Sequence, residues 1–193
     1  IKGLQAVASP KKIAAKRAAG IDVISLGIGD PDHPTYPHVV RAMQEAVADR
    51  ANQNYPSNRG REEFRRAFSE FYRDRFGVEI DPENEVIPAI GAKECIYILC
   101  FAFLDPGDVA LASDPGYPVY TGGPILAGAE AVLLPLKERL GFAPDLDAID
   151  ATTAERARLL FLNYPNNPSG AIVPDGFFEQ VVEVPRKNEI LVV

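Results

Sequence analysis

The sequence predicts an α/β fold built on a mainly parallel β-sheet, and two observations lead to this prediction. From residue 85 onward, short apolar runs alternate with segments of helical periodicity, an order typical of parallel strands joined by helices. The length of 193 residues suffices for one domain with a substantial core and a small appendage. Ligands bind such sheets at the carboxyl ends of the strands, so we look for a site in the loops after Ile90, Ser113 and Asn163.

Residues 1–84 are expected to contain three helices, one strand and turn-rich or irregular stretches between them. Ser9 followed by Pro10 is a typical start of a helix, and Gly20 is a typical end. Apolar side chains recur at helical spacing beyond Pro37, and aromatic side chains do so beyond Gly60, where we interpret the stripe as core packing. The predicted elements are a helix over 11–19, a strand over 22–26, a helix from 37 and a helix over 60–76.

The alternation itself comes from the rest of the chain, where apolar runs bounded by turn residues read as strands. Strands are expected at 85–90, 108–113, 131–135, 158–163 and 190–193. Helices are expected at 93–104, 117–127, 145–151 and 175–187.

Charge and hydropathy exclude several classes of function. The net charge of -7 repels a polyanion, so nucleic acid is not expected as a partner. The longest apolar run covers only residues 95–104, whereas a membrane span needs roughly 20 residues, and no secretory signal is visible. Cys95 and Cys100 lie in this run, where we interpret them as small core residues of a protein in the reducing cytoplasm.

Both ends of the sequence read as cut. It opens on Ile1, and it closes on the apolar run 190–193, which is typical of a buried parallel strand. We therefore expect the sequence to be a fragment of a longer protein.

The first candidate loop, Gly91 to Glu94, joins a predicted strand to a predicted helix. Free N–H groups at a helix start favour an anion such as phosphate, and Lys93 adds a positive charge. The alternative is a plain turn that carries a surface lysine. The loop does not match the Walker pattern of nucleotide-binding proteins.

The second candidate loop, Asp114 to Tyr120, begins with a turn at Asp-Pro-Gly. The turn leaves Tyr117 at the end of a strand, where an aromatic ring can stack on a flat cofactor. The alternative is a tyrosine that packs only on its own loop.

The third candidate loop is Asn163 to Gly170, with the sequence Asn-Tyr-Pro-Asn-Asn-Pro-Ser-Gly. Asn167 precedes a proline, which disfavours the α conformation for it and keeps the loop rigid. A rigid amide can donate a hydrogen bond to a phenolate-type oxygen. A capping turn would explain a single asparagine, but not the whole string.

Five segments together resemble, in order and spacing, the class I/II aminotransferases, which are fold-type I enzymes that use pyridoxal 5'-phosphate (PLP). The subgroup that the chain most resembles is LL-diaminopimelate aminotransferase, on residues 24–31 and 163–168. The five segments are Ser25–Asp32, Asn54–Pro56 followed by Gly60, Gly91–Glu94, Asp114–Pro118 and Asn163–Gly170.

The resemblance implies a fold, a domain division and a cofactor site. The fold is a three-layer α/β sandwich with a mainly parallel sheet, the incomplete PLP-binding large domain over 37–193. Residues 1–36 are the N-terminal arm and part of a small domain. For PLP, the implied contacts are the backbone N–H groups of Ala92 and Lys93 to the phosphate, Tyr117 stacked on the pyridine ring, and Asn167 hydrogen-bonded to the ring's 3-oxygen.

Substrate and partner are implied in the same way. Gly29 and Lys93 bind the substrate, an amino acid or a 2-oxo acid. Tyr55 reaches the PLP phosphate of the neighbouring subunit, which implies a two-fold homodimer with shared active sites.

Three elements of the family pattern are missing from the sequence. The aspartate that pairs with the pyridine nitrogen, the Schiff-base lysine and the arginine that binds the substrate carboxylate are all expected beyond Val193. No catalytic residue is therefore assigned, and the chain by itself is expected to be inactive. Residues 4–7 also lack a tyrosine that relatives often carry, which leaves the substrate open.

The implied reaction moves an amino group between an amino acid and a 2-oxo acid, either LL-diaminopimelate and 2-oxoglutarate or a broad-range pair. C–S lysis or decarboxylation on the same scaffold remains an alternative, as does a non-catalytic regulatory domain. A dinucleotide-binding oxidoreductase is excluded, because Gly27-x-Gly29 is followed by Asp32 instead of a third glycine and by prolines instead of a helix.

Overall fold

The computed structural model describes residues 10–24, 29 and 31–193, apart from the side chains of 184–188. The chain divides into two compact units, Ile1–Ser57 and Asn58–Val193, which are considered separately. Within the described part of the chain, no helix combines the length and the apolar character that crossing a membrane requires.

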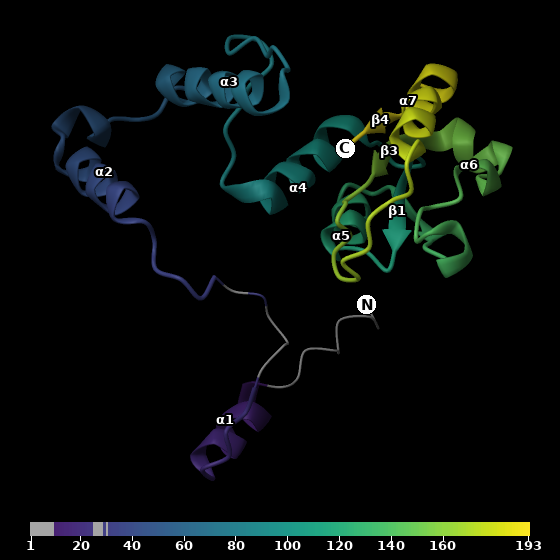
Figure 1. Cartoon of the computed structure of the whole chain (residues 1–193). Helices are drawn as coiled ribbons and strands as arrows, with labels where there is room; N and C mark the ends of the chain where they lie inside the picture. Colours follow the sequence, from purple (N-terminus) through teal and green to yellow (C-terminus); the bar gives the residue numbers. More distant parts are fainter. Residues whose placement is uncertain (1–9, 25–28, 30) are drawn as a thin grey trace. The chain divides into compact units, whose positions relative to one another are not determined.

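The first unit contains two of the predicted helices. Helix α1 spans Pro10–Ala18 and helix α2 spans Pro37–Ala48, so both helix predictions are confirmed (Figure 1). A short 3-10 helix, η1, follows at Arg50–Gln53 and is capped by Asp49, whose carboxylate accepts a hydrogen bond from the Ala51 N–H (2.9 Å). The predicted strand 22–26 is wrong for residues 22–24, which are irregular, and residues 25 and 26 lie outside the described part.

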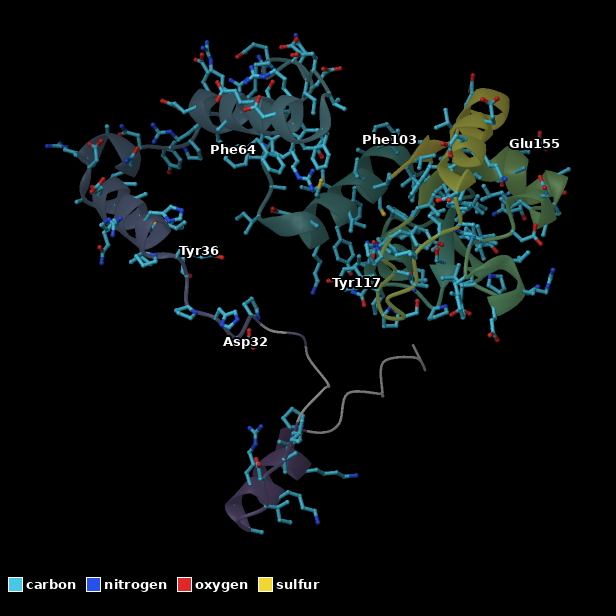
Figure 2. All side chains as sticks on the ribbon, viewed as in Figure 1. Asp32, Tyr36, Phe64, Phe103, Tyr117 and Glu155 are labelled. Carbon is cyan, nitrogen blue, oxygen red and sulfur yellow. The ribbon has the colours of Figure 1, made fainter. Side chains whose placement is uncertain are left out.

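Helix α3, at Glu62–Phe76, confirms the third predicted helix. Acidic side chains occupy its first turn and arginines its last turn, which suits the helix dipole, and Gly77 ends it in the left-handed conformation (φ 67°). Its phenylalanines, however, are 37–57% exposed, and Phe64 points away from the ribbon in Figure 2. The expected core packing is therefore wrong for the described residues, because no described element covers the stripe.

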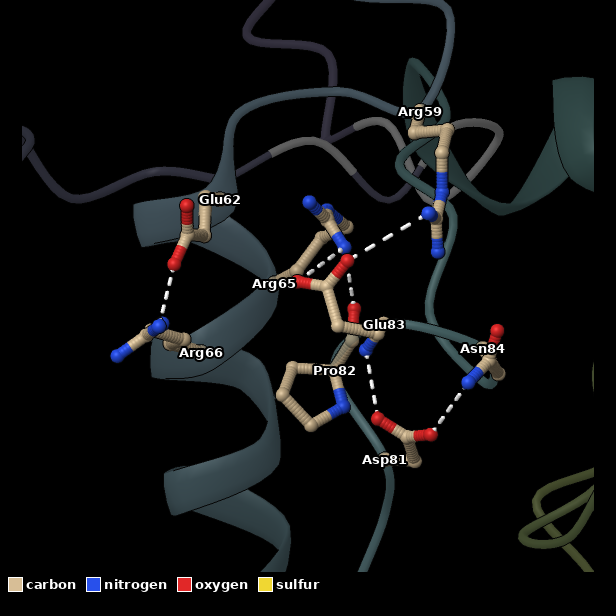
Figure 3. Close-up of polar contacts among 8 residues, drawn as sticks. All are labelled: Arg59, Glu62, Arg65, Arg66, Asp81, Pro82, Glu83 and Asn84. Atoms are coloured by element: carbon tan, nitrogen blue, oxygen red, sulfur yellow. Dashed lines mark hydrogen bonds and ion pairs between the residues drawn. The ribbon is translucent and has the colours of Figure 1, made fainter.

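An arginine of α3 holds the segment that follows the helix (Figure 3). Arg65 is only 6% exposed; its Nη1 donates to the Pro82 carbonyl (2.6 Å) and pairs with the Glu83 carboxylate (3.1 Å). Glu83 also pairs with Arg59 (3.5 Å), and its N–H donates to the Asp81 carboxylate (2.8 Å). These contacts tie the residues before and after α3 to the helix.

The strand predicted at 85–90 is wrong, because these residues form no strand. Ile87 and Ile90 are exposed, and Pro88 has no N–H to give to a neighbouring strand. Pro88 packs instead on Gly60, where the Cβ of any other residue would lie 2.1 Å from the proline Cγ.

The sheet has four strands in the order β2-β1-β3-β4, and every neighbouring pair is parallel. The predicted α/β fold with a parallel sheet is thus confirmed. The strands are β1 (Val109–Asp114), β2 (Glu130–Pro135), β3 (Ala157–Phe161) and β4 (Leu191–Val192).

The connecting helices follow the prediction with one exception. Where a helix is predicted at 145–151, the structure has the 3-10 turn Leu146–Ala148. Helix α6 begins only at Ala151, because the carboxylate of Asp150 caps it by accepting from the Thr153 N–H (2.9 Å). The elements found are α4 (Gly91–Phe103), α5 (Val119–Leu126), the 3-10 turns η2 (Glu138–Leu140) and η3 (Leu146–Ala148), α6 (Ala151–Arg156) and α7 (Phe177–Asn188).

Helices cover both faces of the sheet and make three layers (Figure 1). Ile96 and Cys100 of α4 and Val119 of α5 pack with Ala110, Leu159 and Phe161 on one face. On the other face, Ile190 packs with a set of buried strand residues: Val109, Leu111, Leu134, Ala157 and Leu160. Helix α7 adds Phe177 and Val181 on that side. The central strands are buried on both faces, as apolar parallel strands should be.

Arg156 holds the amino-terminal edge of the sheet. Its Nε donates to the Gly107 carbonyl (2.8 Å), and its Nη2 pairs with the Glu130 carboxylate (2.8 Å). One side chain just before β3 therefore joins the starts of β1 and β2, at the edge opposite the candidate loops.

Candidate active site

The start of α4 offers free backbone donors. Gly91 adopts a left-handed conformation (φ 81°), and the Glu94 carboxylate accepts a hydrogen bond from the Ile90 N–H. The first N–H groups of a helix, here including those of Ala92 and Lys93, have no acceptor within the helix. The positive end of the helix dipole and the exposed Lys93 ammonium make this a place for an anion.

Tyr117 lies next to that helix start. The Lys93 Nζ is 5.9 Å from the centre of the Tyr117 ring, within the range of a cation–π contact. The ring is half-buried and meets Tyr120 edge-on (5.8 Å between centres), and Tyr120 stacks on the buried Phe161 (5.1 Å). Burial raises the pKa of Tyr120. Tyr117, labelled in Figure 2 beside α5, is thus supported from the core.

A tight turn fixes the loop that carries Tyr117. A Cβ on Gly116 would lie 2.2 Å from the Ser113 carbonyl oxygen, so only glycine fits between β1 and the tyrosine.

The third loop is held by its own asparagines. Asn163 accepts a hydrogen bond from the Asn167 N–H through its side-chain oxygen (3.1 Å), and the Asn167 side chain is exposed. Asn166 is buried, and its amide donates to Ser169 Oγ (2.7 Å) and to the Pro115 carbonyl of the second loop (3.3 Å). Asn166 is not predicted from the sequence, because nothing in the string Asn-Asn indicates which asparagine is buried.

Tyr164 anchors the same loop to the segment before η3. Its hydroxyl donates to the Phe142 carbonyl (3.1 Å), and Phe142 is one of the non-glycine residues with positive φ (58°). The Tyr164 ring packs edge-on against Phe177 (5.9 Å), and burial raises its pKa.

The sequence-predicted residues fall into two groups. Ala92, Lys93, Tyr117 and Asn167 lie in the second unit, where the Lys93–Tyr117 contact and the Asn166–Pro115 bond join the three loops. Gly29 and Tyr55 belong to the first unit and are exposed. The binding roles of all six residues stay predictions.

A separate cavity of about 660 Å³ lies between residues 140–149 and α7. Among the described side chains that line it, four are carboxylates and none is basic (Asp145, Asp147, Asp175 and Glu183). It would repel a phosphate, so the loops at the sheet edge are the better candidate.

The donor set of these loops fits one kind of ligand. Helix-start N–H groups and an ammonium suit a phosphate, a supported tyrosine suits a flat ring, and a rigid asparagine suits a ring oxygen. This is what we expect of an α/β domain that binds a phosphorylated aromatic cofactor at the carboxyl edge of its sheet.

The chain belongs to the aminotransferase class I and II family, whose model matches residues 21–193. Enzymes of this family use pyridoxal phosphate, so the family and the cofactor implied by the sequence are confirmed.

Individual relatives agree. The chain is 53% identical over 180 residues to an LL-diaminopimelate aminotransferase of Desulforudis audaxviator, covering 93% of this chain and 46% of that protein. It is 47% identical over 182 residues to the enzyme of the same name from Halothermothrix orenii, covering 94% of this chain and 47% of that protein. The chain thus spans about half the length of the curated relatives it matches.

Solved structures give the same picture. Apo-BacF from Bacillus subtilis superposes with a TM-score of 0.88 at 39% identity, covering 94% of this chain and 46% of that one. A probable N-succinyldiaminopimelate aminotransferase from Thermus thermophilus gives a TM-score of 0.85 at 32% identity, covering 93% of this chain and 48% of that one.

Proposed function

We propose that the full-length protein transfers an amino group between an amino acid and a 2-oxo acid, with LL-diaminopimelate as donor and 2-oxoglutarate as acceptor. The observation that carries the proposal is the contact between Lys93 and Tyr117 at the start of α4, since it joins an anion site to a ring face. The names of the relatives support the choice of LL-diaminopimelate.

Each residue of this edge has one task in the proposal. The N–H groups of Ala92 and Lys93 bind the phosphate, Tyr117 supports the ring, and the Asn167 amide donates to the ring oxygen. Bound PLP supplies the electron sink for the reaction. The Lys93 side chain also attracts the substrate's negative charge.

Several parts of the proposal concern residues outside this edge. Gly29 binds the substrate, and the exposed Tyr55 reaches the phosphate of a second copy in a two-fold homodimer. The PLP-binding domain is 37–193, and 1–36 belongs to the arm and a small domain. The catalytic lysine comes from residues beyond Val193, so the 193-residue chain alone does not catalyse transfer. Two free cysteines support a cytoplasmic location.

The test is an assay of the full-length protein with PLP and 2-oxoglutarate against a panel of amino donors. We expect glutamate to form with LL-diaminopimelate faster than with L-aspartate or N-succinyl-LL-diaminopimelate. The 193-residue chain serves as the inactive control. Product formation without a 2-oxo acid, such as release of a thiol or carbon dioxide, would instead identify a lyase or decarboxylase and overturn the proposal.

A further inference from the structure

Asn166 is the most deeply buried polar residue of the third loop. It is 3% exposed, whereas its neighbours Pro165 and Asn167 are exposed. An amide in a dry environment destabilises the fold unless its polar atoms are hydrogen-bonded. The partners of Asn166 therefore tell what the residue does.

Those partners divide between two loops. Within the third loop, the side-chain amide of Asn166 donates to Ser169 Oγ (2.7 Å), and its carbonyl accepts from the Gly170 N–H (2.7 Å). Its N–H donates to the carbonyl of Ala171, the residue directly after the loop (2.8 Å). The same side-chain nitrogen also donates to the Pro115 carbonyl (3.3 Å), which is 51 residues away in the sequence and belongs to the second loop.

Both ends of this bridge lie beside a proposed cofactor contact. Pro115 precedes Tyr117 by two residues, across Gly116, where the turn is too tight for a Cβ. Asn166 is followed directly by Asn167, whose N–H is held by the Asn163 side chain. Because the turn at Gly116 is tight, a shift of Pro115 is expected to move Tyr117. A shift of Asn166 is expected to move the adjacent Asn167 in the same way.

We infer that Asn166 is a positioning residue, which fixes the distance between the ring-stacking Tyr117 and the ring-oxygen donor Asn167 without touching the cofactor. This inference rests on the proposed function of those two residues. It makes the ring half of the site depend on Asn166 and leaves the phosphate half, at the start of α4, independent of it.

Two substitutions test this in the full-length protein. Asn166→Leu keeps the shape of the side chain and removes its donors. Asn166→Ser keeps a hydroxyl near Ser169, but its side chain is too short to reach the Pro115 carbonyl. This variant is used for the measurement if Asn166→Leu does not fold. Ser169→Ala is the matched control inside the loop, because it leaves the bridge to Pro115. Asn84→Ser is the control for an exposed asparagine whose side chain bonds within its own turn (2.7 Å to Asp81).

The readouts are the dissociation constant for PLP, the visible circular dichroism of bound PLP, and the inhibition constant of inorganic phosphate as a competitor. We expect both Asn166 variants to bind PLP roughly 10-fold more weakly, the factor for one hydrogen bond to the ring lost through a displaced Asn167, with a changed dichroism signal. The constant for phosphate should stay within about twofold, and both controls should resemble the wild type.

Three results would overturn the inference. Unchanged PLP affinity and dichroism would mean that the bridge does not position the ring contacts. A rise of the phosphate constant by the same factor as that of PLP would mean a general structural role. If the wild-type protein binds phosphate but gives no dichroism signal with PLP, the proposed function fails as well, and this outcome is recognisable before any variant is made.

Discussion

The ammonium of Lys93 lies 5.9 Å from the centre of the Tyr117 ring. A flat ligand that stacks on the same face of Tyr117 takes the place of the ammonium, which is then free to approach a phosphate at the start of α4. Tyr117 is therefore expected to contact the ring of the ligand and Lys93 its phosphate. Substitutions of the two residues can measure these two contributions to binding separately.

Removing the Tyr117 ring should weaken PLP binding in the full-length protein. Tyr117→Ala loses stacking worth about 0.5–1.5 kcal/mol beyond the buried area, so the dissociation constant should rise by about 10-fold, whereas Tyr117→Phe keeps the ring and should bind almost normally. Absorbance titration with PLP measures both. Equal losses in the two variants would mean that the hydroxyl, and not the ring, makes the contact. Tyr36→Ala, in the first unit, serves as control.

Removing the charge of Lys93 should weaken PLP binding in a salt-dependent way. Lys93→Gln is expected to lower the affinity several-fold at low ionic strength and less at about 0.5 M salt, because exposed charges are screened over roughly 10 Å at 0.1 M salt. The matched control is Lys137→Gln, another exposed lysine, at the start of η2. A loss that does not change with salt would contradict an electrostatic role.

The buried arginine of α3 should matter more to stability than its exposed neighbour. Arg65→Leu removes the donor to the Pro82 carbonyl and leaves Glu83 with Arg59 as its remaining described basic partner, which should cost about 1–3 kcal/mol in the free energy of unfolding. Arg66→Gln breaks only an exposed pair with Glu62, worth about 0.5 kcal/mol or less. Urea unfolding compares the two variants, and equal costs would show that the burial of Arg65 is unimportant.

The two cysteines should differ in reactivity. Burial raises the pKa of Cys100 to about 11 from the usual 9.0, whereas Cys95 is half-buried. Iodoacetamide at about pH 8 should therefore label Cys95 first, and Cys95→Ser should abolish the fast phase. Since the folded state holds the Cys100 proton more tightly than the unfolded state, this residue's contribution to stability is complete below about pH 9 and falls between about pH 9 and 11. Fast labelling of Cys100 in the native protein would contradict its burial.

The sequence predicted the parallel sheet well, because each strand from β1 to β4 is an apolar run bounded by turn residues such as Asp108 or Gly128. The strand at 85–90 was wrong for a physical reason: a strand exists only with a hydrogen-bonded neighbour, which periodicity cannot reveal. The prediction for the aromatic stripe of α3 failed for a similar reason. Periodicity correctly placed Phe64 on one face of a helix, but it cannot show whether another element packs against that face.

For the site, the sequence identified the loops better than the residues in them. Lys93 and Tyr117 were singled out and are found in contact. Asn166 was not, because its role depends on the carbonyl of Pro115, and a backbone atom so far along the chain leaves no trace in local sequence.

The clamp formed by Arg156 at the starts of β1 and β2 lies at the opposite edge of the sheet from every loop considered for ligand binding. The contacts that hold the strands together therefore lie at their amino-terminal ends, and the candidate ligand contacts lie at their carboxyl ends. Substitutions of exposed side chains in these loops, such as that of Asn167, are therefore expected to leave the starts of β1 and β2 joined. A sheet held from the opposite edge in this way is expected to keep its strands in register while the exposed side chains of the loops change.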